Sequence, residues 1–317
     1  MLPLHDPALK APAQVVRDGF LAAARLEGMP VRVEPTGAEV AQILTAYGEA
    51  VAGGARVVVG PLTRNAVTAL AKSGQVPVPT LTLSLPEREA LPLPANLVGF
   101  GLSAEEEARQ VATLAFAEGR RHAAVVVADT ALARRMQAAF GAQWLALGGR
   151  LAASVLFAPG REAAVKGLAA AGADMIFLAA GAQEARAVRP YLAATLPVYA
   201  TSQAFAGRLT DPRNVDLAGV RFVDIPWLLE LDHPAVMIYP RPQPPLPVEL
   251  ERLYALGIDA ARLAAVFWQQ GVGRLELDGV TGRLTLGADG IINRRAVAAE
   301  FVQDTVVVIE AAGKSTP

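Results

Sequence analysis

Apolar and polar positions along the first hundred residues follow a pattern typical of strands that alternate with amphipathic helices. The clearest example is RVVVGPLTRNAVTALA at residues 56–71. Its β-branched run at 57–59 is typical of a strand buried on both faces, and Gly60-Pro61 ends that strand. Thr63 or Asn65 can cap the helix that follows. The backbone N–H groups at that helix start either hold an anion at the edge of a cleft or belong to an ordinary strand-to-helix joint.

The same alternation on both sides of this stretch predicts a parallel sheet covered by helices. Leu2-Pro3-Leu4 is expected to be the end of a first strand, so that the chain begins inside that strand. Further strands are predicted at 31–34, 76–83 and 97–100, and helices at 13–27 and 40–51.

The alternation restarts at Ser103, which predicts a second sheet laid down after the first. Ser103 and Glu106 have the spacing of a capping box, and the three carboxylates at 105–107 suit the positive end of a helix dipole. Strands are predicted at 122–128, 151–157, 175–179, 198–200 and 219–223, with helices at 131–147, 162–171 and 183–194 between them.

The last part of the chain changes character twice. A proline-rich segment at 233–247 excludes both a helix and a central strand, and it predicts an ordered loop or an extended crossover. One strong helix follows at 248–270, and the apolar residues on both sides of 287–290 then predict a hairpin. A final strand is predicted at 306–309.

Composition narrows the class of protein. With 317 residues, of which 53% are hydrophobic and 19% charged, the chain is long and apolar enough for about two domains with large cores. A net charge of −1 excludes the basic field that attracts nucleic acid or anionic lipid. The absence of cysteine excludes disulfides, thiol catalysis and cysteine-ligated metal. No apolar run has the length of a membrane span, and no signal peptide is visible.

The motifs of common catalytic and cofactor sites are absent. The sequence has no GxGxxG after a strand, no Walker loop, no GxSxG elbow and no HExxH. His5, His122 and His233 stand in unrelated segments, so no metal site is predicted. Asp129 and Asp224 follow predicted strands, where open α/β sheets place ligand contacts, and both positions equally suit helix caps or turns. Neither an enzyme activity nor a cofactor is predicted.

Several segments together resemble one family. VRDGFLAAA at 16–24, VVVGPLTRNAVTALA at 57–71 and VPVPTLTLS at 76–84 are similar to the first lobe of type I periplasmic binding proteins. A closer resemblance is to the LppC or LpoA branch, whose members are outer-membrane lipoproteins that activate penicillin-binding proteins. The segments that carry it are FGLSAEEEARQVA at 100–112, RPYLAATLPVYATS at 189–202, LAGVRFVDIPWLL at 217–229, RLYALGIDAARLA at 252–264 and LDGVTGRLTLGADGIINRR at 277–295.

This resemblance implies an α/β fold of two Rossmann-like lobes, each with a parallel sheet flanked by helices, joined by three crossovers. Lobe one is expected at 1–101 plus 248–277, lobe two at 102–226 plus 278–312, and a proline-rich crossover at 227–247. The three crossovers are expected near 101–103, 226–247 and 277–282. Lobes of this kind commonly close on a ligand by a hinge motion.

Full-length members of the branch also carry a signal with a lipobox cysteine and an N-terminal helical-repeat domain, which this sequence lacks. We therefore expect an excised C-terminal domain of a lipoprotein. It would act in the periplasm and be anchored to the outer membrane through the missing N-terminal segment.

The resemblance also implies a set of ligand-cleft residues. In amino-acid-binding relatives, hydroxyl side chains and backbone groups of lobe one and an acidic residue of lobe two hold the ligand's carboxylate and amine. The matching positions here are Thr63, Arg64, Asn65, Thr82, Ser84, Leu85, Asp129, Tyr199, Thr201, Ser202 and Asp224. Arg64 stands where those receptors prefer a small hydroxyl residue, and an arginine suits a different anionic group. Trp227 either lines the cleft or packs beneath the crossover.

Two functions follow from the resemblance. The chain is either a non-enzymatic module that activates a bifunctional penicillin-binding protein, or a solute receptor for an amino acid or another small molecule. The two functions are compatible, because a ligand between the lobes would bias an open–closed equilibrium and with it the surface offered to a partner.

Overall fold

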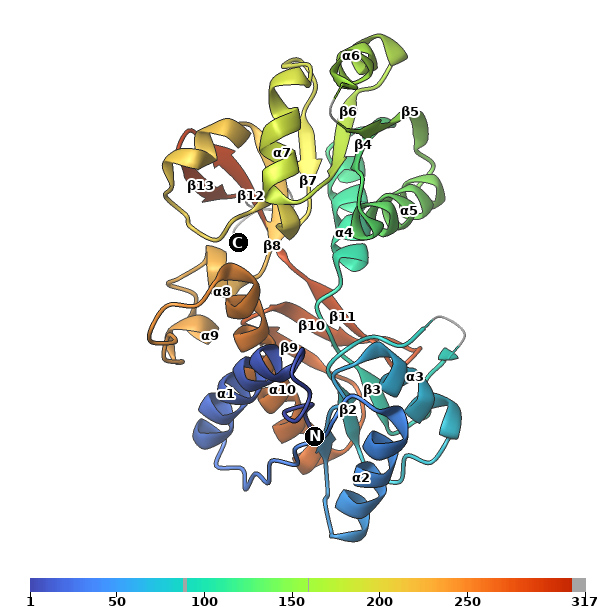
Figure 1. Ribbon diagram of the computed structural model, residues 1–317, viewed down its shortest axis with the longest axis vertical. Helices are drawn as coiled ribbons and strands as arrows, with labels where there is room; N and C mark the ends of the chain where they lie inside the picture. The colour runs from blue at the N-terminus through green and yellow to red at the C-terminus, as the bar shows by residue number, and fades with distance from the viewer. Residues whose placement is uncertain (88–89, 159, 310–317) are drawn as a thin grey trace, which may run out of the picture. The chain divides into compact units, whose positions relative to one another are not determined.

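The computed structural model describes residues 1–87, 90–158 and 160–309, and it divides into two compact units (Figure 1). Unit 1 consists of Met1–Leu102 and Leu231–Arg295. Unit 2 consists of Ser103–Glu230 together with the described residues from Ala296 onward. The chain therefore passes between the units three times, at 102–103, 230–231 and 295–296.

Unit 1 contains a parallel sheet with helices on both faces. Its strands are β1 (Val58–Val59), β2 (Thr80–Thr82) and β3 (Leu97–Gly99), in the order β1-β2-β3. Its helices are α1 (Lys10–Leu26), α2 (Val40–Ala52), α3 (Arg64–Ser73), α9 (Pro234–Met237) and α10 (Val248–Gln270). Val16 and Leu256, from α1 and α10, pack with Leu81 in one core cluster, whereas Tyr47 and Leu70, from α2 and α3, pack with strand residues in another. The β-branched run at 57–59 suits this sheet because apolar clusters cover it on both sides.

The predicted strand at 31–34 is wrong as a regular strand. The segment makes one isolated parallel bridge, between Leu2 and Pro35. The Leu2 N–H donates to the Glu34 carbonyl at 3.1 Å, and the Thr36 N–H donates to the Leu2 carbonyl at 2.8 Å. Residues 34–36 therefore pair with Leu2, while residues 31–33 run beside the sheet without such a ladder.

A second, antiparallel sheet in unit 1 contains the hairpin that the sequence predicts. Its strands are β9 (Glu276–Gly279), β10 (Gly282–Leu286) and β11 (Ile292–Arg295), in the order β11-β10-β9. Leu284 and Ile292 are buried in the same core cluster as Leu256 of α10. This packing places 278–295 in unit 1, whereas the family resemblance implied that these residues belong to lobe two. The third crossing lies at 295–296 rather than near 277–282, which is the β9–β10 turn. Residues 310–312 of the expected second lobe lie outside the described residues.

Unit 2 contains a seven-stranded sheet of the doubly wound type. The strands are β4 (His122–Ala128), β5 (Arg150–Phe157), β6 (Met175–Ala179), β7 (Val198–Ala200), β8 (Val220–Asp224), β12 (Val297–Val302) and β13 (Thr305–Val308). Their order is β13-β12-β8-β7-β6-β4-β5, and every pair from β5 to β8 is parallel. β12 and β13 extend the sheet in antiparallel fashion. In open α/β sheets with this kind of strand order, ligands bind at the carboxyl ends of the strands.

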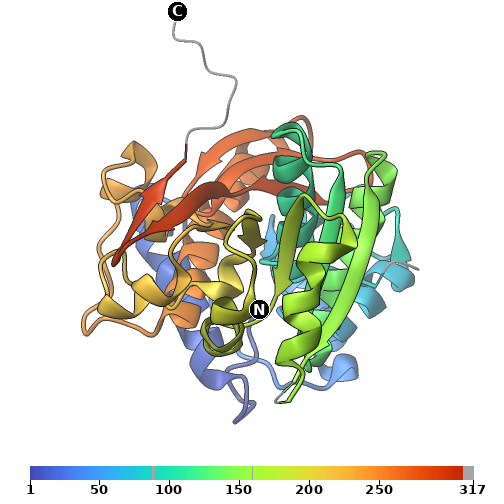
Figure 2. The same ribbon diagram turned by 90° about the horizontal axis from the view of Figure 1, so that it is seen from above.

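Helices cover both faces of this sheet (Figures 1 and 2). The α-helices are α4 (Ala104–Ala117), α5 (Ala131–Ala146), α6 (Glu162–Lys166), α7 (Ala182–Val188) and α8 (Pro226–Leu229), and the 3-10 helices are η2 (Gly167–Ala171), η3 (Arg189–Tyr191), η4 (Ser202–Ala204) and η5 (Pro212–Leu217). Ser103 Oγ accepts the Glu106 N–H at the start of α4, as the capping-box spacing predicts. Phe140 of α5 stacks on Phe177 of β6, with ring centroids 4.1 Å apart, and on Trp144, at 5.4 Å. These rings fill the core between the α4–α5 layer and the sheet.

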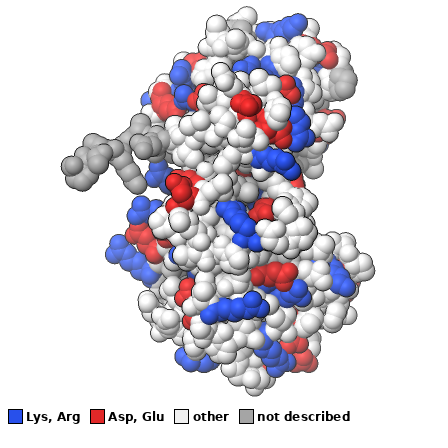
Figure 3. Space-filling model, turned by 90° about the vertical axis from the view of Figure 1, so that its left-hand side faces the viewer, with Lys and Arg blue, Asp and Glu red and all other residues white. Residues whose placement is uncertain are grey.

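Membrane-spanning helices and surface charge were compared with the expectations from the sequence. No helix in the described part of the chain is both long and apolar enough to cross a bilayer. On the face drawn in Figure 3, lysine and arginine are interspersed with aspartate and glutamate, in keeping with the net charge of −1. Long-range electrostatic attraction of nucleic acid or anionic lipid therefore has no source on this face.

Candidate functional site

At the carboxyl end of β1, Thr63, Arg64 and Asn65 begin helix α3. Thr63 is the N-cap residue, and its Oγ1 is buried without a hydrogen-bond partner among the described residues. Arg64 and Asn65 are exposed. Asn65 lines a shallow pocket of about 280 Å³ together with Thr68, Ala69, Lys72 and Glu87 on the outer side of α3. The three predicted residues are thus adjacent, but Thr63 alone turns its polar atom inward.

At the carboxyl end of β2, the polar groups are engaged with the chain itself. The hydroxyl of Thr82, which is completely buried, donates to the Ser84 carbonyl at 2.8 Å. Ser84 and Leu85 are half-buried, and the Ser84 backbone lies 3.2 Å from the position that a Cβ on Gly101 would take. Thr82 therefore stabilises the turn after β2 and has no hydroxyl proton left to donate to a ligand.

At the carboxyl end of β7 in unit 2, the polar residues are buried. Thr201 is fully buried, and its hydroxyl lies 3.3 Å from the Met136 sulfur. Ser202 is 2% exposed, and its backbone N–H donates to the Glu107 carboxylate at 3.2 Å. Glu107 lies in the first turn of α4, where the sequence indicates only a helix-dipole role. The structure shows that it also supplies an acceptor to a backbone donor at a position expected to hold a ligand.

Asp129, Asp224 and Trp227 occupy different surroundings from one another. Asp129 follows β4 at the surface and forms an ion pair with Arg134 of α5. Asp224 ends β8, is fully buried, and accepts the N–H of Ile225 at 2.8 Å. Trp227 of α8 is also fully buried. Asp129 therefore pairs with a side chain close by in the chain, and Asp224 accepts a neighbouring backbone N–H, while Thr130 and Ile225 are the N-cap residues of the helices that follow.

The structure places Tyr199 away from the predicted edge. Its hydroxyl donates to Glu118 Oε2 at 2.6 Å, and Glu118 is the residue at the C-terminal end of α4, close in the chain to where β4 begins. Arg221 pairs with the same carboxylate and with Glu300, 3.0 Å away. Burial, together with the hydrogen bond to Glu118, raises the pKa of Tyr199 to about 12. Tyr199 thus belongs to a partly buried charge cluster with Glu118, Arg221 and Glu300.

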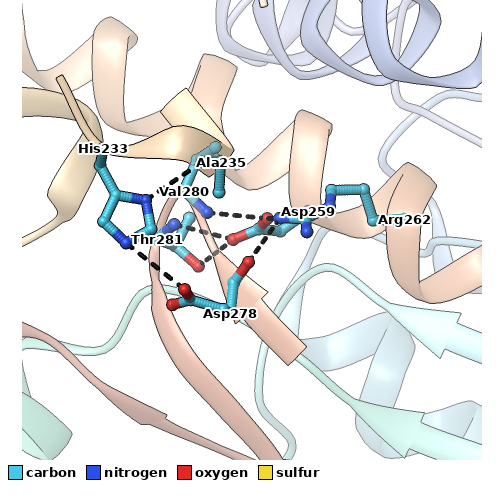
Figure 4. A network of polar contacts seen from close by, with 7 residues as sticks. All are labelled: His233, Ala235, Asp259, Arg262, Asp278, Val280 and Thr281. Carbon is cyan, nitrogen blue, oxygen red and sulfur yellow. Dashed lines mark hydrogen bonds and ion pairs between the residues drawn. The ribbon is translucent and has the colours of Figure 1, made fainter. Parts of the chain in front are cut away.

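Figure 4 shows the network of polar contacts around a buried carboxylate in unit 1, that of Asp259. Asp259 of α10 accepts the N–H groups of Val280 and Thr281, at 3.0 and 2.7 Å, and the Thr281 hydroxyl at 2.6 Å. Arg262 lies 3.3 Å from Asp259 and also donates to the Asp278 carbonyl. Burial raises the pKa of Asp259, while these donors favour its charged form. The network fastens the β9–β10 turn to α10.

The same network reaches the proline-rich segment. His233 Nε2 lies 3.4 Å from the Asp278 carboxylate, and its Nδ1 accepts the Ala235 N–H at 3.2 Å (Figure 4). A Cβ on Gly279 would lie 2.5 Å from Asp259 Oδ2, so glycine is required there. Asp259, Asp278 and Gly279 come from two segments that carry the family resemblance, 252–264 and 277–295. The network therefore joins two segments that lie apart in the sequence.

A cavity of about 440 Å³ lies within unit 1. Residues of α1 and α10, including Phe20 and Trp268, line it together with residues of the segments 29–33 and 54–57. None of the sequence-predicted site residues lines this cavity. Nor do three His, Asp or Glu side chains gather as a metal site would require anywhere among the described residues.

Comparison with known proteins decides the family. Residues 1–304 match the family model described as "LppC putative lipoprotein". The chain belongs to the LppC family. Penicillin-binding protein activators LpoA from Pantoea ananatis and Pectobacterium parmentieri are 29% and 28% identical to it, over 87% and 97% of this chain. The chain covers 47% and 52% of those two proteins, so it spans about half the length of these relatives.

Solved structures of LppC-like and receptor-like proteins share the fold. A protein described as a "putative branched-chain amino acid ABC transporter" from Chromobacterium violaceum is 39% identical, with a TM-score of 0.82, over 94% of this chain and 97% of that one. The C-domain of LpoA from Haemophilus influenzae, described as a regulator of PBP1A, is 24% identical, with a TM-score of 0.78, over 97% and 98%. These matches confirm the predicted α/β fold of the type I periplasmic binding proteins.

Proposed function

We propose that this LppC chain is the non-enzymatic, periplasmic part of an outer-membrane lipoprotein that activates a bifunctional penicillin-binding protein. The observation that carries this proposal is the family match over 1–304, together with curated relatives named as penicillin-binding protein activators. Activation would occur through protein–protein contact. The anchor would be a lipid-modified segment outside the present sequence.

The burial and hydrogen bonding of the residues at the strand ends support a role in protein–protein contact. Thr82, Thr201 and Ser202, which would bind an amino acid in a receptor of this fold, are buried and hydrogen-bonded within their own units. Releasing such groups toward a ligand costs the hydrogen bonds they already make. A protein that binds its partner through its outer surface keeps these internal hydrogen bonds.

We select one surface in unit 1 for the first test of partner contact. Met237 and Ile238 are 67% and 58% exposed, and Leu231 is 54% exposed close by in sequence. They adjoin the segment 240–247, which contains five prolines. Large apolar side chains that monomeric proteins expose together often mark contact sites. Val215, in unit 2, is 56% exposed and serves as a matched control.

The test uses the purified chain and the bifunctional penicillin-binding protein of the same bacterium. We expect binding, and an increase in the rate of glycan polymerisation, of transpeptidation, or of both. The double variant Met237→Asp, Ile238→Asp should weaken binding by about tenfold or more, as loss of about 1.4 kcal/mol implies, while Val215→Asp should not. The proposal fails if neither this chain nor the full-length protein binds the synthase or changes either rate.

The second candidate is a solute receptor of the branched-chain amino acid class. The observation that favours it is the 39% identity to the Chromobacterium violaceum protein over nearly the whole of both chains. Arg64, which is exposed at the start of α3, would then bind an anionic group of the ligand. Amino-acid receptors prefer a small hydroxyl residue at this position.

A further inference from the structure

The strand β5 lies at one end of the seven-stranded sheet of unit 2 and pairs, among the described strands, with β4 alone (Figure 1). It has eight residues, Arg150–Phe157. Its register against β4 shifts once, at Ala152, and is regular from there to Phe157. An edge strand of this length offers unpaired backbone groups to another chain unless charges, prolines or a covering segment protect it.

The outer edge of β5 carries backbone groups that have no backbone partner. On the other side of β4, the His122 carbonyl accepts the Asp174 N–H at 2.8 Å, so His122 and every second residue after it face β6. Val125 therefore faces β5, and it bonds to the residues before and after Ser154, its partner in the register. Ser154 and Leu156 consequently turn their N–H and C=O groups outward, where no backbone partner meets them among the described residues.

Three leucines expose apolar surface beside this edge. The Ser154 hydroxyl accepts a side-chain N–H of α5 at 2.8 Å, and a Leu151 methyl group lies 3.6 Å from the position that a Cβ on Gly141 of α5 would take. Leu156 lies on the same side of the sheet as Ser154, two residues earlier, and Leu145 lies one turn beyond Gly141 on α5. Leu145, Leu151 and Leu156 are 58%, 43% and 37% exposed. Exposed apolar side chains that gather in this way often mark a contact surface.

Charge is confined to the amino-terminal end of the edge. Residues 151–158 contain neither a charged residue nor a proline, so neither protects the edge from pairing. Arg150 is exposed, and it forms no ion pair with any carboxylate in the described part of the chain. Because β5 has no carboxylate of its own, a second copy of this strand would not neutralise Arg150, whereas a segment of a different protein can.

We propose that the outer edge of β5 is a docking site for an extended segment of the penicillin-binding protein, an assignment that rests on the proposed function. The segment joins the sheet of unit 2 as an additional strand and bonds to the outward N–H and C=O groups of Ser154 and Leu156. Its apolar side chains pack on the three exposed leucines, and a carboxylate near one end pairs with Arg150. Backbone pairing supplies affinity, while the leucines and Arg150 select the segment.

Hydrogen exchange locates the added strand. The chain is labelled alone and with the purified bifunctional penicillin-binding protein of the same bacterium. Exchange at the outward amides of 150–158 should slow by about tenfold or more in the complex, because those N–H groups gain acceptors. The segment 122–128 is the internal control: β4 is paired on both sides in the free chain, so its exchange should not change.

A matched pair of variants separates the backbone from the side chain. Ser154→Pro removes an outward N–H and leaves the bonds to β4 in place, as proline on an edge strand allows. Ser154→Ala keeps that N–H and removes only the hydroxyl. Ser154→Pro should weaken binding of the penicillin-binding protein by about tenfold, and Ser154→Ala by less than about twofold.

Two further variants leave the backbone unchanged, and melting temperatures check that every variant is folded. The double variant Leu151→Lys, Leu156→Lys places charges on the edge and should weaken binding by about tenfold as well. Arg150→Glu should weaken binding most at low salt, because it replaces an attraction by a repulsion that salt screens.

The outcomes distinguish this site from the proposed function. If the wild type binds the penicillin-binding protein while Ser154→Pro and the double lysine variant bind it equally well, the docking site is overturned and the proposed function stands. If the wild type does not bind it at all, both fail together. A wild-type dimer that Ser154→Pro dissociates would show that a second copy occupies the edge, which would also overturn the proposal.

Discussion

Tyr199 carries its hydroxyl into a partly buried cluster of charges, where it donates to Glu118 beside Arg221. Its ring is fully buried in the core of unit 2. A neutral phenol that donates to a carboxylate is stabilised there, and a phenolate would be repelled by the same carboxylate. The residue therefore stabilises unit 2 in its protonated form.

This arrangement predicts a pH dependence of stability. The pKa of Tyr199 is about 12 in the folded protein and about 10 when unfolded. Since the folded value is the higher one, the contribution is complete below pH 10 and is lost as the pH rises from 10 toward 12. Urea denaturation at several pH values should show a steeper loss for the wild type than for Tyr199→Phe. Parallel curves above pH 10 would contradict this assignment, because the other tyrosines are present in both proteins.

At the scale of elements, helices α1 and α10 cross at two glycines. A Cβ on Gly257 would lie 2.1 Å from the Val16 carbonyl, and one on Gly19 would lie 2.0 Å from the Tyr254 carbonyl. The backbones of the two helices are therefore nearly in contact. This close crossing places α1 and α10 as one layer on the parallel sheet of unit 1.

Gly257→Ala should destabilise the protein, because the added methyl group meets rigid backbone and must push the helices apart. We expect a cost of about 1–3 kcal/mol or more in the free energy of unfolding. Gly48→Ala is the matched control: Gly48 is exposed within α2, and a Cβ there meets nothing within 4 Å. It should stabilise the protein by about 0.5–1 kcal/mol. Chemical denaturation of both variants measures the difference, and a neutral Gly257→Ala would contradict the close crossing.

For the whole molecule, the two proposed functions differ in what they require of small ligands: a receptor must bind one, whereas an activator that works by protein contact need not. The hydroxyl and backbone donors at the ends of β2 and β7 are already bonded inside their units. A thermal-shift panel with leucine, isoleucine, valine, other amino acids and muropeptides should therefore produce no shift. A receptor would be stabilised by about 2.7 kcal/mol at a ligand concentration one hundred times its Kd. A clear shift with any one amino acid would favour the receptor.

The periodicity of the sequence predicted most of the fold, because it depends on neighbours only a few residues apart. β4, β6, β7 and α10 have the predicted bounds, and the hairpin of β10 and β11 lies where its turn residues indicate. Of the candidate site, the adjacency of Thr63, Arg64 and Asn65 was predictable for the same reason, since one strand-to-helix joint contains all three. The direction in which the Tyr199 side chain points was not predictable, because it depends on the face of β7 that meets Glu118.

The sequence by itself indicated most of the strands and helices, the absence of cysteine chemistry, and the resemblance to the family, since each of these can be read from residues close together in the chain. It did not indicate β9 or β12. Only the tertiary structure decided that 278–295 joins unit 1, through Asp259 and Thr281 and the burial of Leu284. It alone revealed that Glu107 accepts the backbone N–H of Ser202. The physical reason is that burial and hydrogen bonding join residues from 22 to 95 positions apart, and no local pattern records which of those partners will meet.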